Sequence, residues 1–300
     1  MKAVFDTSVE SAYDDEITER YHFPQKYLSL VNETVGDWIV FRQPRANRGS
    51  KSYFGTARVI RVERDPAKGD HHYAYLAEFL NFDRPVPWRP GGEYAEFVLR
   101  NIAQVSQVGI YLRGRSVRAL EDADFARIVE IGLAETLAPE NGSRLGLGVQ
   151  DFDQAVFKYP VEEQVRRVEL MLVNRKIRDA NFRSQVCSAY EDRCAVTSLK
   201  IINGGGRSEV QAAHIWSVAE GGPDIVQNGL ALSGTVHWLF DRHLISLTDE
   251  YRLLVSHNKV PSQLKSLFEM QMDRIHLPRN KRLWPHPTYI RRHREAFIAA

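Results

Sequence analysis

The stretch at residues 193–253 constrains the fold more than any other part of the 300-residue sequence. Residues 210–215, VQAAHI, form an extended run that places His214 at the end of a strand. A loop is expected at residues 220–224, because two glycines and a proline break both helical and strand periodicity. Residues 228–232, NGLAL, lead into a second apolar segment, and a helix follows. The sequence therefore predicts two short strands, a loop and a helix.

The predicted helix carries two polar side chains on one face. His237 and Asp241 are four residues apart in TVHWLFD, and this spacing brings them together on a helix surface. With His214 and Asn228 they resemble a set that holds a general base beside a divalent cation. The base would deprotonate water, and the cation would stabilise charge on a phosphodiester as its P–O bond breaks. Nitrogen and oxygen donors suit Mg, Mn, Ni or Zn and do not choose among them.

This segment is similar to the core of the HNH endonucleases, the ββα-metal nuclease family. AAHI matches the first histidine strand of the family, NGLAL its central asparagine strand and HWLFD its metal-binding helix. The separations agree as well, with fourteen residues from His214 to Asn228, nine more to His237 and four more to Asp241. Residues 182–197 resemble the helix and turn that precede this core, so the resemblance covers residues 175–257.

The HNH resemblance implies a role for each of these side chains. His214 would be the general base that activates water. His237 would be a metal ligand on the helix, and Asp241 would be a second ligand. Asn228 would pin the loop and help to orient His214. The implied cofactor is one divalent ion, such as Mg or Mn.

The chain departs from the family pattern at two places. Ala213 stands where many members have another ligand, so Asp241 would complete the site, with Glu209, water and phosphate as further donors. Many members also hold a structural zinc with two CxxC pairs. Here Cys194 is followed by Thr197, and neither position of the second pair is a cysteine. One cysteine cannot make that site, so we expect no structural zinc.

The sequence before residue 137 has a β pattern. Strands are expected at residues 36–41, 52–62 and 72–82, with a basic, glycine-bearing loop between the first two. Several strands with long loops suggest a small barrel, and residues 122–137 repeat apolar positions at helical spacing. This order resembles the PUA superfamily, whose EVE, YTH and SRA-like members read modified bases. The resemblance covers residues 25–135.

The PUA-like resemblance implies a pocket for a nucleotide rotated out of the DNA duplex, with aromatic faces around the base. Trp38, Tyr53 and Trp88 are candidates, because Trp88 lies in a proline-rich loop and Tyr53 at a strand start. Aromatic residues of β-rich domains usually belong to the core, so packing inside the sheet is the alternative for each. The basic loop offers candidates for contacts with DNA phosphates, namely Arg45, Arg48 and Lys51.

Length and composition fit a two-domain α+β protein. Residues 1–137 would form the PUA-like small barrel with flanking helices, and residues 161–300 the HNH domain with added helices. Residues 138–160, rich in Gly, Pro, Asn and Ser, would form a linker. No run of eighteen apolar residues occurs and no apolar signal core begins the chain, so we expect a cytoplasmic protein without a membrane span. The two cysteines would be free thiols.

These patterns together predict a modification-dependent DNA endonuclease that reads a flipped, modified cytosine. The net charge of +2 does not exclude DNA, because basic residues cluster locally at 42–58, 113–118 and 279–294. One such site cuts one strand, so double-strand cleavage of DNA would need a homodimer or two engaged copies. Two alternatives stay open. One is an HNH restriction endonuclease specific for an unmodified sequence, and the other is a DNA-binding protein with a decayed nuclease core.

Overall fold

The computed structural model describes residues 1–7, 15–44, 49–138, 160–256, 259–268 and 274–299. The chain divides into two compact units, and the division falls between Arg178 and Asp179. The predicted linker lies outside the described residues except at its two ends. No helix in the described ranges is long and apolar enough to cross a bilayer.

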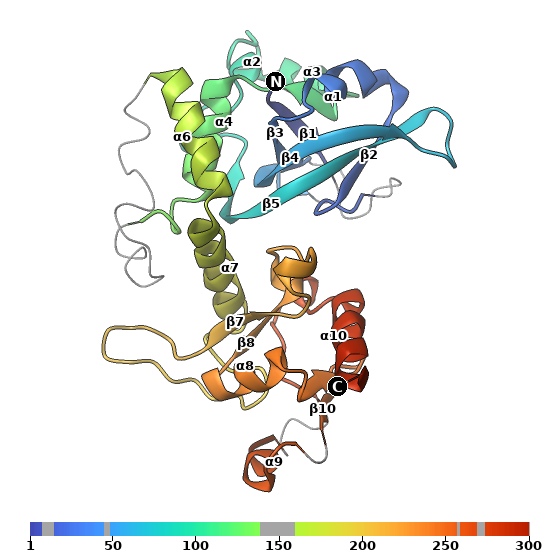
Figure 1. Ribbon diagram of the computed structural model, residues 1–300. Coiled ribbons are helices and arrows are strands. Elements are labelled where there is room, and N and C mark those ends of the chain that lie inside the picture. The colour runs from blue at the N-terminus through green and yellow to red at the C-terminus, as the bar shows by residue number, and fades with distance from the viewer. Residues whose placement is uncertain (8–14, 45–48, 139–159, 257–258, 269–273, 300) are drawn as a thin grey trace. The chain divides into compact units, whose positions relative to one another are not determined.

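A curled, six-stranded mixed sheet forms the centre of the first unit (Figure 1). Its strands run in the order β2-β5-β4-β3-β1-β6, and β1 pairs with β3 in parallel whereas the other pairs are antiparallel. Its strands are β1 (Ala3–Asp6), β2 (Arg20–Pro24), β3 (Trp38–Gln43), β4 (Ser52–Arg64), β5 (His71–Pro87) and β6 (Val117–Ala119). The three longest, β3, β4 and β5, are the strands that the sequence predicted.

The long strand β5 corrects one expectation. The sequence predicts a proline-rich loop around Trp88, yet residues 84–87 extend β5 and pair with the start of β4. Ser52 is opposite Pro87, and Tyr53 is opposite Val86. The ladder is interrupted by register shifts, and Glu78 has a positive φ of 55°. Such bulges bend a strand and increase its twist, which is consistent with the curl of this sheet.

The first unit also contains short helices and two longer ones. They are η1 (Gln25–Tyr27), α1 (Leu28–Glu33), η3 (Pro90–Gly92), α2 (Phe97–Arg100), α3 (Val105–Leu112), α4 (Asp122–Gly132) and α6 (Val161–Val173). Helix α4 approaches the sheet closely, since a Cβ on Gly132 would lie 2.4 Å from Cγ of Phe82. Helix α6 packs on α4 through one buried face. The sequence had assigned α6 to the nuclease domain, so the division lies later than predicted.

The second unit contains an antiparallel hairpin followed by a helix, in the predicted order. The hairpin strands are β7 (Gln211–His214) and β8 (Gly229–Leu232), and the helix is α8 (Gly234–Asp241). Further elements are α7 (Arg175–Ala189), which crosses the division, η6 (Val218–Glu220), η7 (Val226–Asn228), β9 (Ile245–Leu247), β10 (Leu253–Val255), α9 (Ser262–Phe268), η9 (Lys281–Leu283) and α10 (Pro287–Ala299).

One apolar core holds the second unit together. It joins α7, both hairpin strands, α8 and α10 through buried side chains that include Val186, Leu230 and Phe240. Cys187 and Cys194 belong to this core and are free thiols, as predicted. Burial raises the pKa of the Cys187 thiol to about 11, so this sulfur stays protonated at neutral pH.

Candidate nuclease centre and DNA interface

His214 lies at the end of β7, where the sequence placed it, opposite Gly229 of β8. The ring of Phe182, from α7, stacks on its imidazole with 3.8 Å between ring centroids and 7° between planes. Gly229 permits this approach, because a Cβ there would lie 2.4 Å from Cγ2 of Val186 and 3.0 Å from Cζ of Phe182. The His214 side chain keeps 19% of its surface exposed, which leaves a ring edge accessible to solvent.

A buried carboxylate, which sequence reasoning missed, holds the His214 imidazole. Nε2 of His214 lies 3.0 Å from Oδ1 of Asp224, whose side chain is only 3% exposed. Because a carboxylate accepts hydrogen bonds, this contact favours the tautomer with the proton on Nε2. Nδ1 of His214 is then the nitrogen with a free lone pair. Asp224 closes the GGPD segment, and only its place after that turn could have suggested a role.

Asn228 ties together the loop between the two hairpin strands. It is fully buried, and its Nδ2 donates to the carbonyl oxygens of Trp216 and Pro223, each at 2.9 Å. Its Oδ1 accepts from the backbone N–H of Trp216, also at 2.9 Å. Both ends of the loop are thus fixed by one amide, and Asp224 follows directly after the second attachment. The geometry agrees with the loop-pinning role expected of Asn228.

His237 and Asp241 lie together on α8, as their spacing predicted. Nε2 of His237 is 3.3 Å from Oδ2 of Asp241, and Nδ1 is 2.9 Å from Oε1 of Gln211 on β7. An amide oxygen accepts, so Nδ1 of His237 donates and Nε2 is the nitrogen that faces the carboxylate. Burial alone would raise the pKa of Asp241, but the contact with His237 and the positive charge of Arg242 hold that pKa below its usual value.

The remaining metal donors suggested by the sequence are used elsewhere or absent. Glu209 accepts from the backbone N–H of Gly234 at 3.0 Å and so caps the start of α8. Ala213 is buried in the core. No group of three or more His, Cys, Asp or Glu side chains in the described ranges could hold a metal ion. The pair of His237 and Asp241 still offers one imidazole nitrogen and one carboxylate, donors that suit a divalent cation completed by water and phosphate oxygens.

Tyr53 does not occupy a surface where a base could stack. It is fully buried, and its hydroxyl donates to Oε1 of Glu96 at 2.7 Å. Glu96 also accepts from Nε of Arg118 at 2.6 Å, and Arg118 donates to Asp6 at 3.0 Å. Asp6 in turn accepts two hydrogen bonds from Arg42, at 2.8 and 2.7 Å. Tyr53 therefore belongs to a buried polar network, and the expectation of a pocket residue is corrected.

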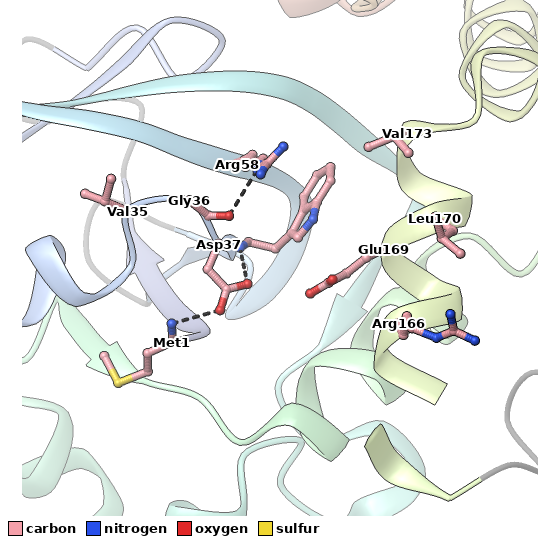
Figure 2. A pocket seen from close by; sticks show the side chains of 10 residues that line it. Met1, Val35, Gly36, Asp37, Arg58, Arg166, Glu169, Leu170 and Val173 are labelled. Atoms are coloured by element: carbon pink, nitrogen blue, oxygen red, sulfur yellow. Dashed lines mark hydrogen bonds and ion pairs between the residues drawn. The ribbon is translucent and has the colours of Figure 1, made fainter. Parts of the chain in front are cut away.

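Trp38 is 3% exposed and lines a hollow of about 570 Å³ in the first unit. Figure 2 shows other residues around this hollow, among them Asp37, Arg58, Glu169 and Leu170. Asp37 accepts from the backbone N–H of Trp38 at 2.7 Å and pairs with the amino group of Met1 at 2.8 Å. The hollow thus combines an aromatic ring with charged groups of both signs.

Trp88 occupies a different place in the first unit. It is partly exposed, its backbone N–H donates to the carbonyl of Lys51, and the Lys51 ammonium lies 5.1 Å from the ring centroid. Trp38, in contrast, pairs with Arg58. Lys51 directly precedes β4, and Arg58 lies within that strand seven residues further on, which corresponds to roughly 20 Å. The structure therefore brings Trp88 and Lys51 together and keeps Trp38 apart. Arg45 and Arg48 lie outside the described residues.

Comparison with known families agrees with the geometry of the second unit. Residues 194–248 match the model of a family described as HNH endonuclease. The match includes the hairpin, its loop and α8, with His214, Asn228, His237 and Asp241. The chain therefore carries an HNH endonuclease domain, which assigns it to the endonuclease class. Nucleases of this family generally use a divalent metal ion.

Three solved structures are similar to the chain at low identity. The modification-dependent TagI restriction endonuclease is 14% identical with a TM-score of 0.31, and the match covers 98% of this chain and 80% of that one. The N-terminal domain of Staphylothermus marinus McrB is 13% identical with a TM-score of 0.30, covering 43% and 93%. The phosphorothioation-dependent restriction endonuclease ScoMcrA is 16% identical with a TM-score of 0.22, covering 99% and 53%. No curated protein matches the sequence.

Proposed function

We propose that this chain is a modification-dependent DNA restriction endonuclease. The HNH domain hydrolyses the phosphodiester, and the first unit, as a PUA-like reader, binds a flipped, modified cytosine. One observation carries the nuclease part of the proposal. Each of the two histidines expected at an HNH centre is fixed by a neighbour of its own, His214 by Asp224 and His237 by Gln211.

His214 acts as the general base. Nδ1 takes a proton from the water that attacks the phosphorus, and Asp224 stabilises the imidazolium that forms. The stacked ring of Phe182 restricts rotation of the imidazole, so the free nitrogen keeps one direction. Asn228 contributes by fixing the loop that carries Asp224 and does not contact the reacting atoms.

His237 and Asp241 would hold one divalent ion, such as Mg or Mn. The amide oxygen of Gln211 accepts a hydrogen bond from Nδ1–H of His237, and this would leave the lone pair of Nε2 for the metal. A bound divalent ion supplies positive charge where negative charge develops on the phosphate oxygens. Water and phosphate oxygens would complete the coordination, since Mg keeps several waters in protein sites.

The reading function is assigned to the hollow beside Trp38. A flipped base needs an aromatic surface for stacking and polar groups for its edge. The hollow offers Asp37 and Arg58 for the edge, and the ring of Trp38, which is 3% exposed, would have to be uncovered before a base could stack on it. Trp88 and Lys51 lie too far from Trp38 to close on the same base. Their partly exposed ring and ammonium suit a contact with the DNA backbone next to the basic loop.

Cleavage of matched plasmids tests this proposal. The plasmids carry unmodified, methylated or hydroxymethylated cytosine, and the full-length protein is assayed with Mg²⁺ or Mn²⁺. We expect cutting of a modified plasmid only. His214→Ala should abolish cutting while DNA binding persists, whereas His286→Ala, which changes an exposed histidine, should cut normally. Equal cleavage of all plasmids would reject modification dependence and leave an endonuclease that recognises an unmodified sequence.

A second candidate function is DNA binding without cleavage. It is favoured by the small donor set, since Ala213 stands where many members of the family have a ligand, and Asp241 is the one carboxylate paired with His237 among the described residues. Metal-dependent nicking by the purified protein excludes this alternative. If the protein does cut, a single site per chain implies that double-strand breaks arise from a homodimer or from two engaged copies. The rate of linearisation should then rise more steeply with protein concentration than the rate of nicking.

A further inference from the structure

We propose that a surface of the second unit, built from cations held on aromatic rings, binds phosphates of duplex DNA beside the nuclease centre. This inference rests on the proposed function, because its partner is the DNA that the HNH domain cuts. We call it the cation–aromatic surface, and it consists of Trp216, Tyr251, Arg274, Lys281, Trp284, Tyr289 and Arg292.

The first half of the surface lies where α10 meets the loop after β7. The guanidinium of Arg292 lies 3.8 Å from the ring centroid of Trp216. Tyr289, one turn earlier on α10, stacks against the same indole with 6.1 Å between ring centroids. The Trp216 ring therefore has an arginine and a tyrosine against it. Arg292 is itself exposed, so its nitrogen atoms are accessible from solvent.

The second half lies around Trp284. Arg274 is 4.7 Å from the Trp284 ring centroid and 5.8 Å from that of Tyr251, and Lys281 is 5.7 Å from Trp284. Both rings are held by hydrogen bonds to backbone. Nε1 of Trp284 donates to the carbonyl of Pro278 at 2.7 Å, and the hydroxyl of Tyr251 donates to that of Pro285 at 3.2 Å. The rings thus form a fixed support for the two cations.

The cations of this surface differ from other arginines in the same segment. Among the described residues, no carboxylate forms an ion pair with Arg274, Lys281 or Arg292, whereas Arg279 pairs with Glu191 and Arg294 with Asp249. An aromatic face attracts a cation without neutralising it, and a guanidinium stacked on a ring keeps its N–H groups directed outward in its plane. Such groups match the oxygens of a phosphate. The positive charge of Arg274, Lys281 and Arg292 is therefore available to a polyanion. Because the nuclease centre adjoins this surface, we infer that the polyanion is duplex DNA.

Hydrogen bonds tie the cation–aromatic surface to the nuclease centre. The backbone N–H of His286 donates to the carbonyl of Gln227 at 2.9 Å, and Nε2 of Gln227 donates to the carbonyl of Arg282 at 2.9 Å. Trp216 is bound by the side chain of Asn228, and it follows His214 by two residues. A strand held on this surface is thereby brought next to the loop that carries the general base.

Salt-dependent binding tests the surface. Full-length protein binds a fluorescent duplex in EDTA, which prevents cleavage, at 50 to 200 mM salt. We compare wild type with Arg274→Gln/Lys281→Gln/Arg292→Gln. The slope of log affinity against log salt is negative, and each lost phosphate contact reduces its magnitude by about 0.9. We therefore expect the magnitude of the slope to be smaller by about 2 to 3 in the triple variant. The control Arg279→Gln, which removes a paired arginine, should keep nearly the wild-type slope. A triple variant with wild-type slope and affinity overturns the proposal.

The outcomes separate this inference from the proposed nuclease. If the wild-type protein cuts no DNA in any metal but the triple variant loses slope, the surface stands and the proposed function fails. If the wild-type protein cuts while the triple variant binds and cuts equally well, the surface is overturned and the nuclease stands. Thermal unfolding of each variant verifies its fold. The single variant Arg292→Gln, expected to lose about 0.9 in slope, replaces the triple variant if that one does not fold.

Discussion

The imidazole of His214 hydrogen-bonds the buried carboxylate of Asp224, with 3.0 Å between Nε2 and Oδ1. The two residues are ten positions apart, at the end of a strand and at the end of the loop that follows it. Asn228 holds that loop at both ends through hydrogen bonds to its backbone. These hydrogen bonds help to fix the distance between His214 and Asp224. Asp224 is therefore a positioning residue, which acts on the reaction through His214.

Asp224→Asn tests this positioning role. The amide can still contact the imidazole, but it no longer stabilises an imidazolium, and it allows the wrong tautomer. We expect kcat to fall by about 10² or more with little change in KM, and the acidic limb of the pH–rate profile to move. Single-turnover cleavage over a pH series measures both effects. Glu250→Gln, at an exposed carboxylate, is the control, and a wild-type pH profile in Asp224→Asn would contradict the assignment.

Asn228→Ala should destabilise the second unit. The substitution removes three hydrogen bonds and leaves backbone groups of Trp216 and Pro223 without this partner in a buried environment. The expected loss is about 2 to 4 kcal/mol in the free energy of unfolding. Urea denaturation measures it, and Asn203→Ala, at an exposed asparagine, should lose much less. Equal losses in the two variants would show that the loop is not held by this amide.

Gly229→Ala should disturb both stability and activity. The added Cβ would overlap Val186 and crowd Phe182, so α7 has to move away from the hairpin. Overpacking of this kind costs about 1 to 3 kcal/mol. Because Phe182 stacks on His214, we also expect slower cleavage at temperatures where the variant is folded. Gly204→Ala is a matched control, since nothing lies within 4 Å of its added Cβ. Normal cleavage by folded Gly229→Ala would show that the stacking of Phe182 on His214 does not contribute to catalysis.

The buried imidazole of His293 should make the second unit sensitive to acid. It lies against the ring of Phe240, contacts the Phe240 carbonyl through Nε2 at 3.0 Å, and contacts Ser246 through Nδ1 at 2.9 Å. Burial lowers its pKa from 6.5 to about 4, although the Phe240 carbonyl opposes this shift. Between these values the unfolded chain binds the proton more readily, so stability falls as pH drops.

The His293 contribution is fully present above pH 6.5 and is lost as pH falls through about 4. Its full size corresponds to about 3 kcal/mol. Urea denaturation midpoints at pH 7, 5.5 and 4 measure it. Compared with wild type, His293→Gln should show a flatter pH dependence, whereas His286→Gln, at an exposed histidine, should not. A wild-type pH dependence in His293→Gln would assign the acid sensitivity to other groups.

The centre of the HNH domain was predictable because its signal is local. The spacing of His214, Asn228, His237 and Asp241 defines a hairpin and a helix without any tertiary information, and each element formed where expected. Asp224 and Phe182 could not be found in this way. Their contacts with His214 depend on the path of the loop between β7 and β8 and on the face of α7 that packs against the hairpin. The spacing of residues in the sequence predicts neither of these.

The first unit was less predictable for a similar reason. Tyr53 is near the start of β4, and its position at a strand start predicts an accessible ring. In the structure the beginning of β4 pairs with β3 on one side and β5 on the other, so Tyr53 is as buried as a residue in mid-strand. Helix α6 shows the same limit, because apolar periodicity identifies a buried face but not the surface against which it packs.

The buried polar network around Tyr53 has a consequence for how the first unit tolerates change. Asp6, Arg42, Glu96 and Arg118 balance one another inside the protein, and each is less than 10% exposed. Loss of one member leaves its partner charged in a nonpolar interior, which destabilises a protein more than removal of the whole pair does. We therefore expect a neutral replacement at one of these positions to be tolerated only when its partner is neutralised too.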